Sequence, residues 1–131
     1  MTLKEFVDTY NGKKVDFDGA FGAQCVDLFR QYNHDVFGLP HTGAVEGAIQ
    51  LYTNYPKLPV EAGYYDRIEY SGNIPLEGDA VIFGETSKNK YGHVAIVLYA
   101  TKSEIVVFEQ TGAHIGTWDY TRCKGFLRRR K

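Results

Sequence analysis

A cysteine at the start of an expected helix is the residue of this chain best suited to nucleophilic chemistry. Cys25 precedes apolar residues that recur at helical spacing from Leu28 to Val36, and Gly38 closes the run. In the first turn of a helix, unpaired backbone amides and the positive end of the dipole favour a thiolate over a thiol. The position therefore predicts a cysteine hydrolase. The alternative is a buried structural cysteine, because free cysteines are among the most buried residues.

Thiol attack on a carbonyl also needs a histidine that accepts the proton and a polar group that holds the imidazole in one tautomer. His93 is the strongest of the four histidines, because it opens an expected strand after Gly92, at a rim where a side chain can face a cleft. Glu109 closes the next expected strand, so a hairpin would bring its carboxylate to His93. A surface histidine and a solvated strand-end carboxylate are the alternatives.

Acidic residues before and within the Cys25 helix have the spacing of a calcium-binding loop. With Asp16 as the first position, the oxygen-bearing positions of such a loop are occupied by Asp18, Ala20, Gly22 and Asp27. The pattern departs from an EF-hand at Phe21, where glycine is expected. The alternative is that Asp16 and Asp18 cap turns while Asp27 complements the helix N-terminus.

Several aromatic residues fall in expected loops or at strand ends rather than in core runs. They are Tyr64, Tyr65, Tyr91, Trp118 and Tyr120. Such positions suit a groove that grips an extended polymer, and Tyr91 and Trp118 are the expected groove residues. The alternative is that they are ordinary residues at the boundary of the core.

Length and composition indicate a globular chain, with residues 1–131 forming one domain. The chain has 44% hydrophobic and 24% charged residues and a net charge of -1, which argues against nucleic acid or an anionic membrane as the main partner. Two distant cysteines form no disulfide framework, and no apolar run is long enough to span a membrane. The N-terminus lacks a secretory segment, so export would need another route or another part of a longer chain.

The order of expected elements predicts an α+β fold. A capping-box pattern at Thr2 and Glu5 starts a first helix, and a third helix is expected from Ala44 to Asn54. Residues 56–63 are expected to be loop. Dense β-branched and aromatic runs predict strands at 80–83, 93–100, 105–110 and 125–129, with a short one at 67–70. Helices followed by an antiparallel meander are typical of helices packed on one side of a sheet.

Three segments together resemble motifs of the CHAP family, the cysteine, histidine-dependent amidohydrolases/peptidases. They are Gly-Ala-Gln-Cys-Val-Asp-Leu at 22–28, Pro-Leu-Glu-Gly-Asp-Ala-Val-Ile-Phe at 75–83 and Gly-His-Val-Ala-Ile-Val at 92–97. Their order and spacing match the family, and the resemblance extends from about Leu3 to Phe126.

This resemblance implies a papain-like α+β fold and a role for each matching residue. Cys25 would be the nucleophile, His93 the general base and then acid, and Glu109 the residue that orients His93. Backbone amides at the helix start would stabilise the oxyanion, with Gln24 as a helper. Many members carry asparagine two residues after the acid, where this chain has Thr111. Calcium-binding phage lysins carry acids like those at positions 16, 18 and 27, which implies a structural Ca²⁺.

The resemblance also implies a substrate. CHAP domains typically cleave bacterial peptidoglycan, either between muramic acid and L-alanine or within the wall peptide, and many belong to phage endolysins or tail-associated lysins. A phage enzyme would be released through a holin-made hole or carried on the virion, and we expect a monomer unless it joins a larger phage assembly. The alternatives are a catalytically inactive wall-binding or structural module of this fold, and the related NlpC-type peptidases.

Overall fold

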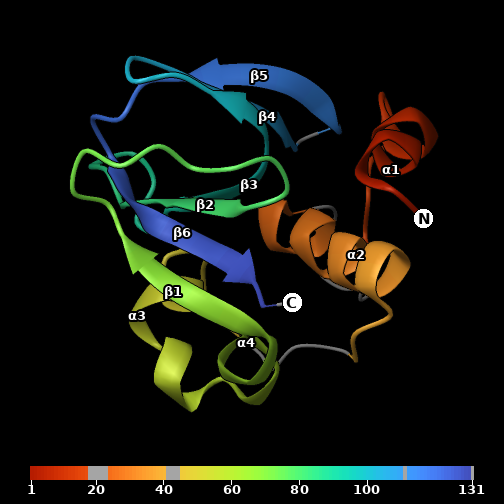
Figure 1. The fold of residues 1–131 in the computed structure, drawn as a ribbon, viewed down its shortest axis with the longest axis horizontal. Coiled ribbons are helices and arrows are strands. Elements are labelled where there is room, and N and C mark those ends of the chain that lie inside the picture. The colour runs from red at the N-terminus through yellow and green to blue at the C-terminus, as the bar shows by residue number, and fades with distance from the viewer. Residues whose placement is uncertain (18–23, 41–44, 111, 131) are drawn as a thin grey trace.

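The computed structural model describes residues 1–17, 24–40, 45–110 and 112–130. In these ranges the helices are α1 (Leu3–Tyr10), α2 (Cys25–Phe37), α3 (Gln50–Thr53) and α4 (Pro59–Tyr64), with a 3-10 turn, η1, at Tyr55–Lys57. The strands are β1 (Tyr65–Glu69), β2 (Ala80–Phe83), β3 (His93–Ala100), β4 (Ile105–Glu109), β5 (His114–Trp118) and β6 (Cys123–Arg129). The described helices precede the strands, and the α+β prediction is confirmed (Figure 1).

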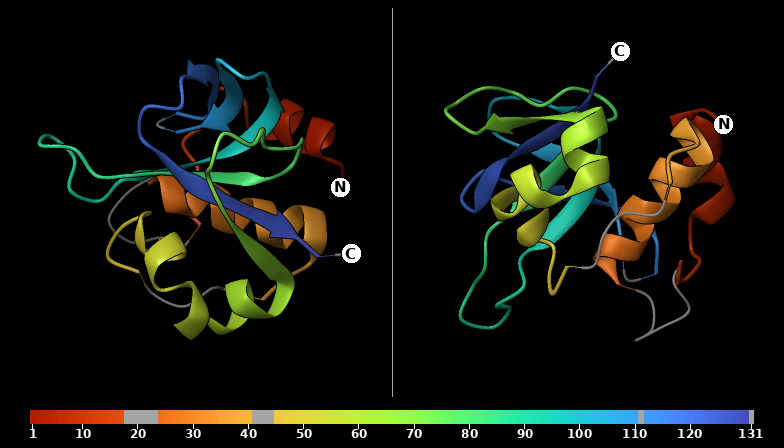
Figure 2. Two further views of the ribbon diagram at one scale, coloured as in Figure 1. Left: turned by 60° about the vertical axis from the view of Figure 1, so that its left-hand side comes forward. Right: turned by 90° about the horizontal axis from the view of Figure 1, so that it is seen from below.

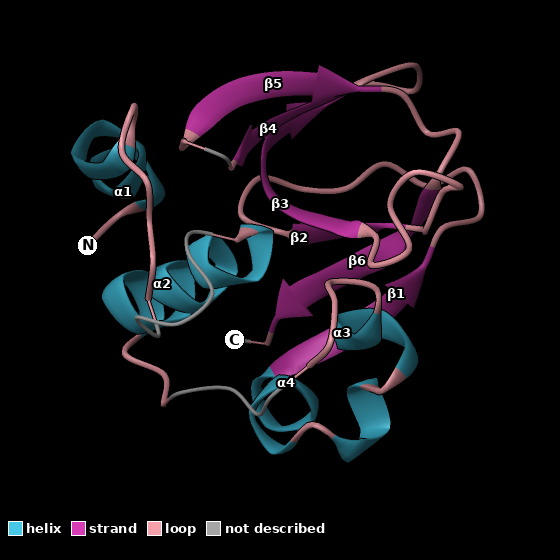
Figure 3. Ribbon diagram, turned by 180° about the vertical axis from the view of Figure 1, so that it is seen from behind, coloured by secondary structure: helices cyan, strands magenta, loops and turns pink. Residues whose placement is uncertain are grey.

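The strands form one antiparallel sheet in the order β1-β6-β2-β3-β4-β5. Strands β2, β3 and β4 form the expected meander and the unpredicted β5 extends it, but β6 returns to lie between β1 and β2, so the meander prediction is wrong for the last strand. Helices α1 and α2 lie together on one side of the sheet (Figure 2). Seen from behind, the N-terminal end of α2 reaches the sheet beside β3 (Figure 3).

The ends of the first two helices follow from capping residues. The Thr2 hydroxyl accepts the Glu5 amide at 3.1 Å while the Glu5 carboxylate accepts the Thr2 amide at 3.0 Å, which confirms the capping box. Helix α2 ends at Gly38, whose φ of 65° is the left-handed conformation that glycine adopts readily. None of the described helices is long and apolar enough to cross a membrane.

Alternation along β3 divides its side chains between two apolar clusters. Val94 and Ile96 join the larger cluster, which contains the buried face of α2, whereas Ala95 and Val97 join a smaller cluster of sheet residues. The smaller cluster therefore lies on the face turned away from α2. By the same alternation, His93 lies in line with Ala95 on that face, at the end of the sheet.

The Gly78-Asp79 motif before β2 ties the sheet to α2. The Tyr32 hydroxyl of α2 donates to the Gly78 carbonyl at 3.0 Å, and Gly78 has a φ of 88°. Asp79 is only 2% exposed and accepts Nη2 of Arg128 at 2.7 Å and the amide of Leu76 at 2.9 Å. These contacts indicate that the motif is structural in this chain.

Three local predictions fail. In the described part of the third predicted helix, only Gln50–Thr53 is helical, and Gly47 before it lies so close to Tyr91 that a Cβ there would be 2.6 Å from the Tyr91 Cβ. The segment 56–63, expected to be loop, contains most of η1 and α4, and α4 carries Pro59 at its start, where its missing N–H is tolerated. Strand β5 was not predicted, because His-Ile-Gly-Thr-Trp contains a glycine and few apolar residues.

Candidate active site

Cys25 is the first residue of α2 and is partly exposed. The helix start is fixed by Asp27, which is 1% exposed and whose carboxylate accepts the Gln24 amide at 3.1 Å. The Asp27 amide in turn donates to the Gln24 carbonyl at 3.0 Å. The first amides of a helix, here those of Cys25 and Val26, precede the first carbonyl that the helix can offer them, so they are suited to a negative charge that develops near Cys25.

His93 opens β3 and lies beside two of the predicted site residues. Its Nε2 lies 2.7 Å from Oε1 of Glu109, and the Cys25 side chain is near enough to the ring to raise its pKa. The preceding Gly92 has a φ of 71°, and a Cβ there would lie 2.6 Å from the Phe83 carbonyl oxygen. The structure therefore brings together residues 25, 93 and 109, which are far apart in the sequence.

Glu109 is held by more partners than the sequence suggests. Its Oε1 also accepts the indole N–H of Trp118 at 2.8 Å, and its Oε2 lies 3.4 Å from Nε2 of His114. Both partners lie on β5. Gly116 leaves the space for this carboxylate, because a Cβ there would lie 1.9 Å from Oε2. The acid is therefore fixed by an unpredicted strand, and His114 was missed because its segment was expected to be loop.

The electrostatics favour a charged His93–Glu109 pair. Burial of the ring acts to lower the pKa of His93, but hydrogen bonds and charges from Cys25 and Glu109 outweigh it and raise this pKa to about 9. Burial acts to raise the pKa of Glu109, whereas hydrogen bonds from His93 and Trp118 hold it below its ordinary value. The imidazole can therefore carry a proton at neutral pH.

The two predicted groove residues lie in different surroundings. Tyr91, 48% exposed, lines the cavity beside Cys25. The Trp118 indole stacks on Phe83 at 4.6 Å and on His93 at 5.3 Å between ring centroids, and Trp118 lines a separate hollow of about 320 Å³. Tyr65, also expected at a groove, is fully buried in the core, so that prediction is wrong.

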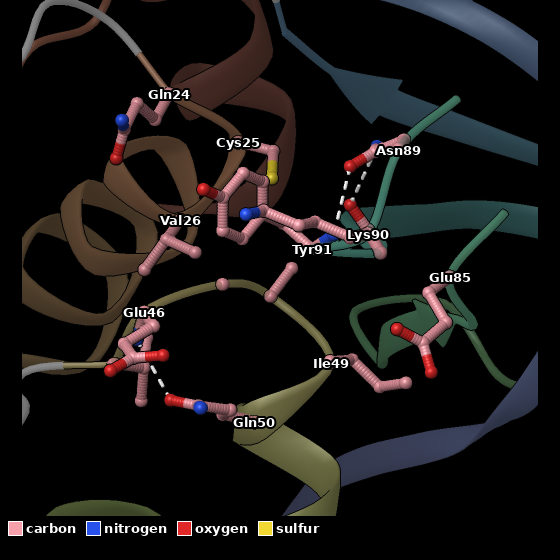
Figure 4. A pocket seen from close by; sticks show the side chains of 14 residues that line it. Gln24, Cys25, Val26, Glu46, Ile49, Gln50, Glu85, Asn89, Lys90 and Tyr91 are labelled. Atoms are coloured by element: carbon pink, nitrogen blue, oxygen red, sulfur yellow. Dashed lines mark hydrogen bonds between the residues drawn. The ribbon is translucent and has the colours of Figure 1, made fainter. Parts of the chain in front are cut away.

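A cavity of about 760 Å³ opens beside the thiol (Figure 4). One wall comes from residues 24–26 at the start of α2, and the other walls come from 45–50 and from the loop between β2 and β3. The Ile49 amide donates to the Tyr91 carbonyl at 2.9 Å, which joins the last two walls. The volume is that of a typical ligand site, with the Cys25 sulfur at its edge.

Gln110 was not predicted to take part in the site, although it follows Glu109 directly. Its side chain is 7% exposed, and its Oε1 accepts the Val15 amide at 2.8 Å. Its Nε2 donates to the Val15 carbonyl at 2.9 Å and to the Gln24 carbonyl. The only sequence signal was its place beside the predicted acid.

Three residues of the predicted calcium site, Asp18, Ala20 and Gly22, lie outside the described residues. Thr111, which was expected to support the active site, also lies outside them. Asp16 is exposed, so its carboxylate is open to a cation. One oxygen of Asp27 accepts the Gln24 amide, and the other lies 3.8 Å from Nη1 of Arg30, which gives Asp27 a structural task at the helix start. Within the described ranges, no group of three or more His, Cys, Asp or Glu residues is placed to hold a metal ion.

Comparisons with known proteins agree with this geometry. Residues 14–111 match the family model described as the CHAP domain. The chain is 30% identical over 149 residues to Endolysin PlyTW of Staphylococcus phage Twort, an alignment that covers 97% of this chain and 30% of that protein. The chain thus spans less than a third of the length of this relative.

Solved structures share the fold. The crystal structure of the wild-type endolysin LysIME-EF1 superposes with a TM-score of 0.74 at 26% identity, covering 95% of this chain and 61% of that one. The crystal structure of Ly7917 gives a TM-score of 0.71 at 18% identity, covering 98% and 63%. The motifs, the arrangement of residues 25, 93 and 109, and the match over most of the chain lead to one conclusion: the chain belongs to the CHAP domain family.

Proposed function

We propose that this chain is a peptidoglycan hydrolase domain that cleaves an amide bond of the bacterial wall peptide by cysteine nucleophilic catalysis. The observation that carries the proposal is the imidazole of His93, which hydrogen bonds with Glu109 and lies beside the Cys25 side chain at the edge of an open cavity. The similarity to an endolysin supports the wall as the substrate. The bond is either the N-acetylmuramoyl-L-alanine amide or a peptide bond of the stem or cross-bridge.

In the proposed mechanism, His93 takes the thiol proton and the sulfur of Cys25 attacks the carbonyl carbon of the scissile amide. The C–N bond then breaks while the His93 imidazolium donates its proton to the leaving nitrogen, which leaves a thioester on Cys25. Water attacks the thioester, His93 takes its proton, and the acid is released with the thiol restored. Because Nε2 of His93 hydrogen bonds with Glu109, Nδ1 is the nitrogen that exchanges a proton with the Cys25 sulfur.

The tetrahedral oxyanion would be stabilised by the backbone N–H of Cys25 and its neighbours at the start of α2, with the Gln24 side chain as a second donor. Gln24 lines the cavity beside Cys25, which supports this role. One such donor contributes on the order of 3 kcal/mol to transition-state stabilisation.

A calcium ion, if bound, would be held by oxygens of Asp16, Asp18, Ala20, Gly22 and Asp27 and would supply fixed geometry rather than chemistry. It would order the segment that presents Cys25. Chelation with EDTA should then lower both the melting temperature and the activity, and added Ca²⁺ should restore them. Identical melting curves with and without EDTA would refute the calcium site.

The partner would be peptidoglycan, and the relative in a phage suggests a phage-encoded enzyme that acts on the cell wall from a lysed host or from the virion. The wild-type protein should clear a suspension of purified walls, and mass spectrometry of the released fragments identifies the bond. Cys25→Ala should retain the wild-type melting temperature and His93→Ala should remain folded with a lower one, because the His93 ring stacks on Phe83 and Trp118; both variants should lose clearing. Equal clearing by either variant contradicts the mechanism, and binding of walls by the wild-type protein without cleavage indicates an inactive wall-binding module.

A further inference from the structure

The carboxamide of Gln110 connects the two halves of the site. It is buried between the end of β4, directly after Glu109, and the start of α2, directly before Cys25. A carboxamide has two N–H donors, and here they serve the carbonyls of Val15 and Gln24 while its oxygen accepts the Val15 amide. The mechanism above uses none of these contacts directly.

The contact with Gln24 acts on a particular N–H group. The carbonyl of Gln24 and the N–H of Cys25 belong to the same peptide group, which is planar and trans, so the two bonds point in opposite directions. Whatever holds the carbonyl therefore also sets the direction of the Cys25 N–H. That N–H is the donor assigned above to the oxyanion.

Within α2, a single hydrogen bond restrains this peptide group. The Asp27 amide donates to the Gln24 carbonyl at 3.0 Å, as the first bond of α2. Gln110 supplies the second donor to the same oxygen, from the strand that carries Glu109. Together the two donors restrict rotation of the peptide plane and couple it to the position of the catalytic acid.

We propose that Gln110 is a positioning residue that aims the Cys25 N–H at the oxyanion. The proposal rests on the proposed function, because it assigns a task within amide cleavage. An oxyanion donor acts only when it is preorganised, so a peptide plane free to rotate loses much of its effect. The thiol should remain beside His93, because packing of α2 on the sheet anchors Cys25 independently of Gln110.

Gln110→Met is the variant that tests this role, because methionine has a similar length and forms no such bonds. Tyr32→Phe is the matched control: it removes another hydrogen bond between α2 and a carbonyl, that of Gly78, at a distance from the thiol. Both variants should lower the melting temperature by a few degrees. If Gln110→Met does not fold, Gln110→Asn keeps the amide on a shorter stem and tests the same contact.

The expected result separates transition-state stabilisation from thiol reactivity. With soluble wall fragments, Gln110→Met should lower kcat by roughly 10- to 100-fold and change KM by less than about twofold. The rate at which iodoacetamide alkylates Cys25, followed against pH, should stay at the wild-type value, because alkylation forms no oxyanion. Tyr32→Phe should change neither quantity. A parallel loss of alkylation and turnover, or an unchanged kcat, overturns the proposal.

A measurement without substrate keeps this proposal distinct from the proposed function. In ¹⁵N NMR spectra, the Cys25 amide resonance should move in Gln110→Met and stay in place in Tyr32→Phe, because only the first change removes a donor to the Gln24 carbonyl. An unmoved resonance overturns the positioning role. A moved resonance in a protein that cleaves no wall fragment supports the positioning of the amide and rejects the hydrolase.

Discussion

Two buried carboxylates lie near opposite ends of β2, and they differ in the kind of partner they hold. Asp79, before β2, is paired with the guanidinium of Arg128 at 2.7 Å. Glu109 lies near the other end, where His93 pairs with Phe83, and its closest partner is the imidazole of His93 at 2.7 Å. The guanidinium is always charged, whereas an imidazole gains and loses its proton near neutral pH.

The difference indicates how one sheet supports both stability and chemistry. A permanent ion pair with a backbone amide contact fixes the end of the sheet near Asp79. At the other end, the proposed mechanism requires the partner to exchange a proton with a thiol, and the carboxylate contacts one ring nitrogen of His93 and leaves the other for Cys25. Removal of the Glu109 charge should therefore lower turnover, whereas removal of the Asp79 charge should lower stability alone.

The largest expected effect is on turnover in Glu109→Gln. An amide keeps the shape of the side chain but loses the charge that stabilises the imidazolium, so kcat should fall on the order of 10²- to 10³-fold. The melting temperature should also fall by a few degrees below about pH 9, because the Glu109 charge helps to raise the pKa of His93, so kcat is compared per folded molecule. Kinetics on purified wall fragments measure the first quantity and calorimetry the second. If turnover stays near the wild-type value, Glu109 is only a structural acid like Asp79.

The second expected effect is a pH dependence of stability that belongs to His93. Its pKa is raised from 6.5 to about 9 in the folded protein, so the stabilisation is complete below 6.5 and is lost as the pH rises through about 9. The loss should be at most about 3 kcal/mol, from the size of the shift. Urea unfolding at the two ends of this range measures it.

The control for this prediction is His93→Gln, which should lose most of the pH dependence while the Asp79–Arg128 pair remains intact. Arg128 keeps its charge over the whole range. If the free energy of unfolding of His93→Gln falls with rising pH by as much as that of the wild-type protein, other groups cause the pH dependence.

The third expected effect is on stability in Asp79→Asn. Breaking a fully buried ion pair costs about 3–5 kcal/mol. Arg128 is 34% exposed here and can recover water, so we expect about 2 kcal/mol. Activity per folded molecule should be unchanged. A variant with normal stability and a lower kcat would reverse the assignment of the two ends.

The smallest expected effect is in Trp118→Phe. Phenylalanine keeps stacking on His93 but removes the indole donor to Glu109, which is a hydrogen bond to a charged group. We expect kcat to fall by roughly five- to tenfold, equivalent to about 1–1.4 kcal/mol. If KM rises instead while kcat is unchanged, Trp118 contacts substrate, as its predicted groove role requires.

The sequence allows prediction of those parts that depend on local signals. Capping at Thr2 and Glu5 and the stop at Gly38 place the first two helices, and strand starts and ends place His93 and Glu109 on facing elements. These signals are local because caps and alternation depend on a few neighbouring residues.

The missed parts depend on contacts between distant segments. A side chain at Gly116 would collide with the Glu109 carboxylate, and one at Gly47 would collide with Tyr91. Nothing in the sequence around either glycine shows which residue it must accommodate. The same holds for Gln110, whose carboxamide reaches residues more than 80 positions away, at Gln24 and Val15. Strand β5, which holds the acid in place, was missed together with His114 for a different reason, because its sequence contains a glycine and few apolar residues.

Alkylation of the two cysteines with iodoacetamide, mapped by mass spectrometry between about pH 6 and 7, tests the central claim most directly. Cys123 is a built-in control, because burial raises the pKa of its thiol to about 12. The account predicts rapid modification of Cys25 alone, at a rate that falls in His93→Gln. Equal, slow modification of Cys25 in the wild-type protein and in His93→Gln would contradict a thiolate held by the imidazole.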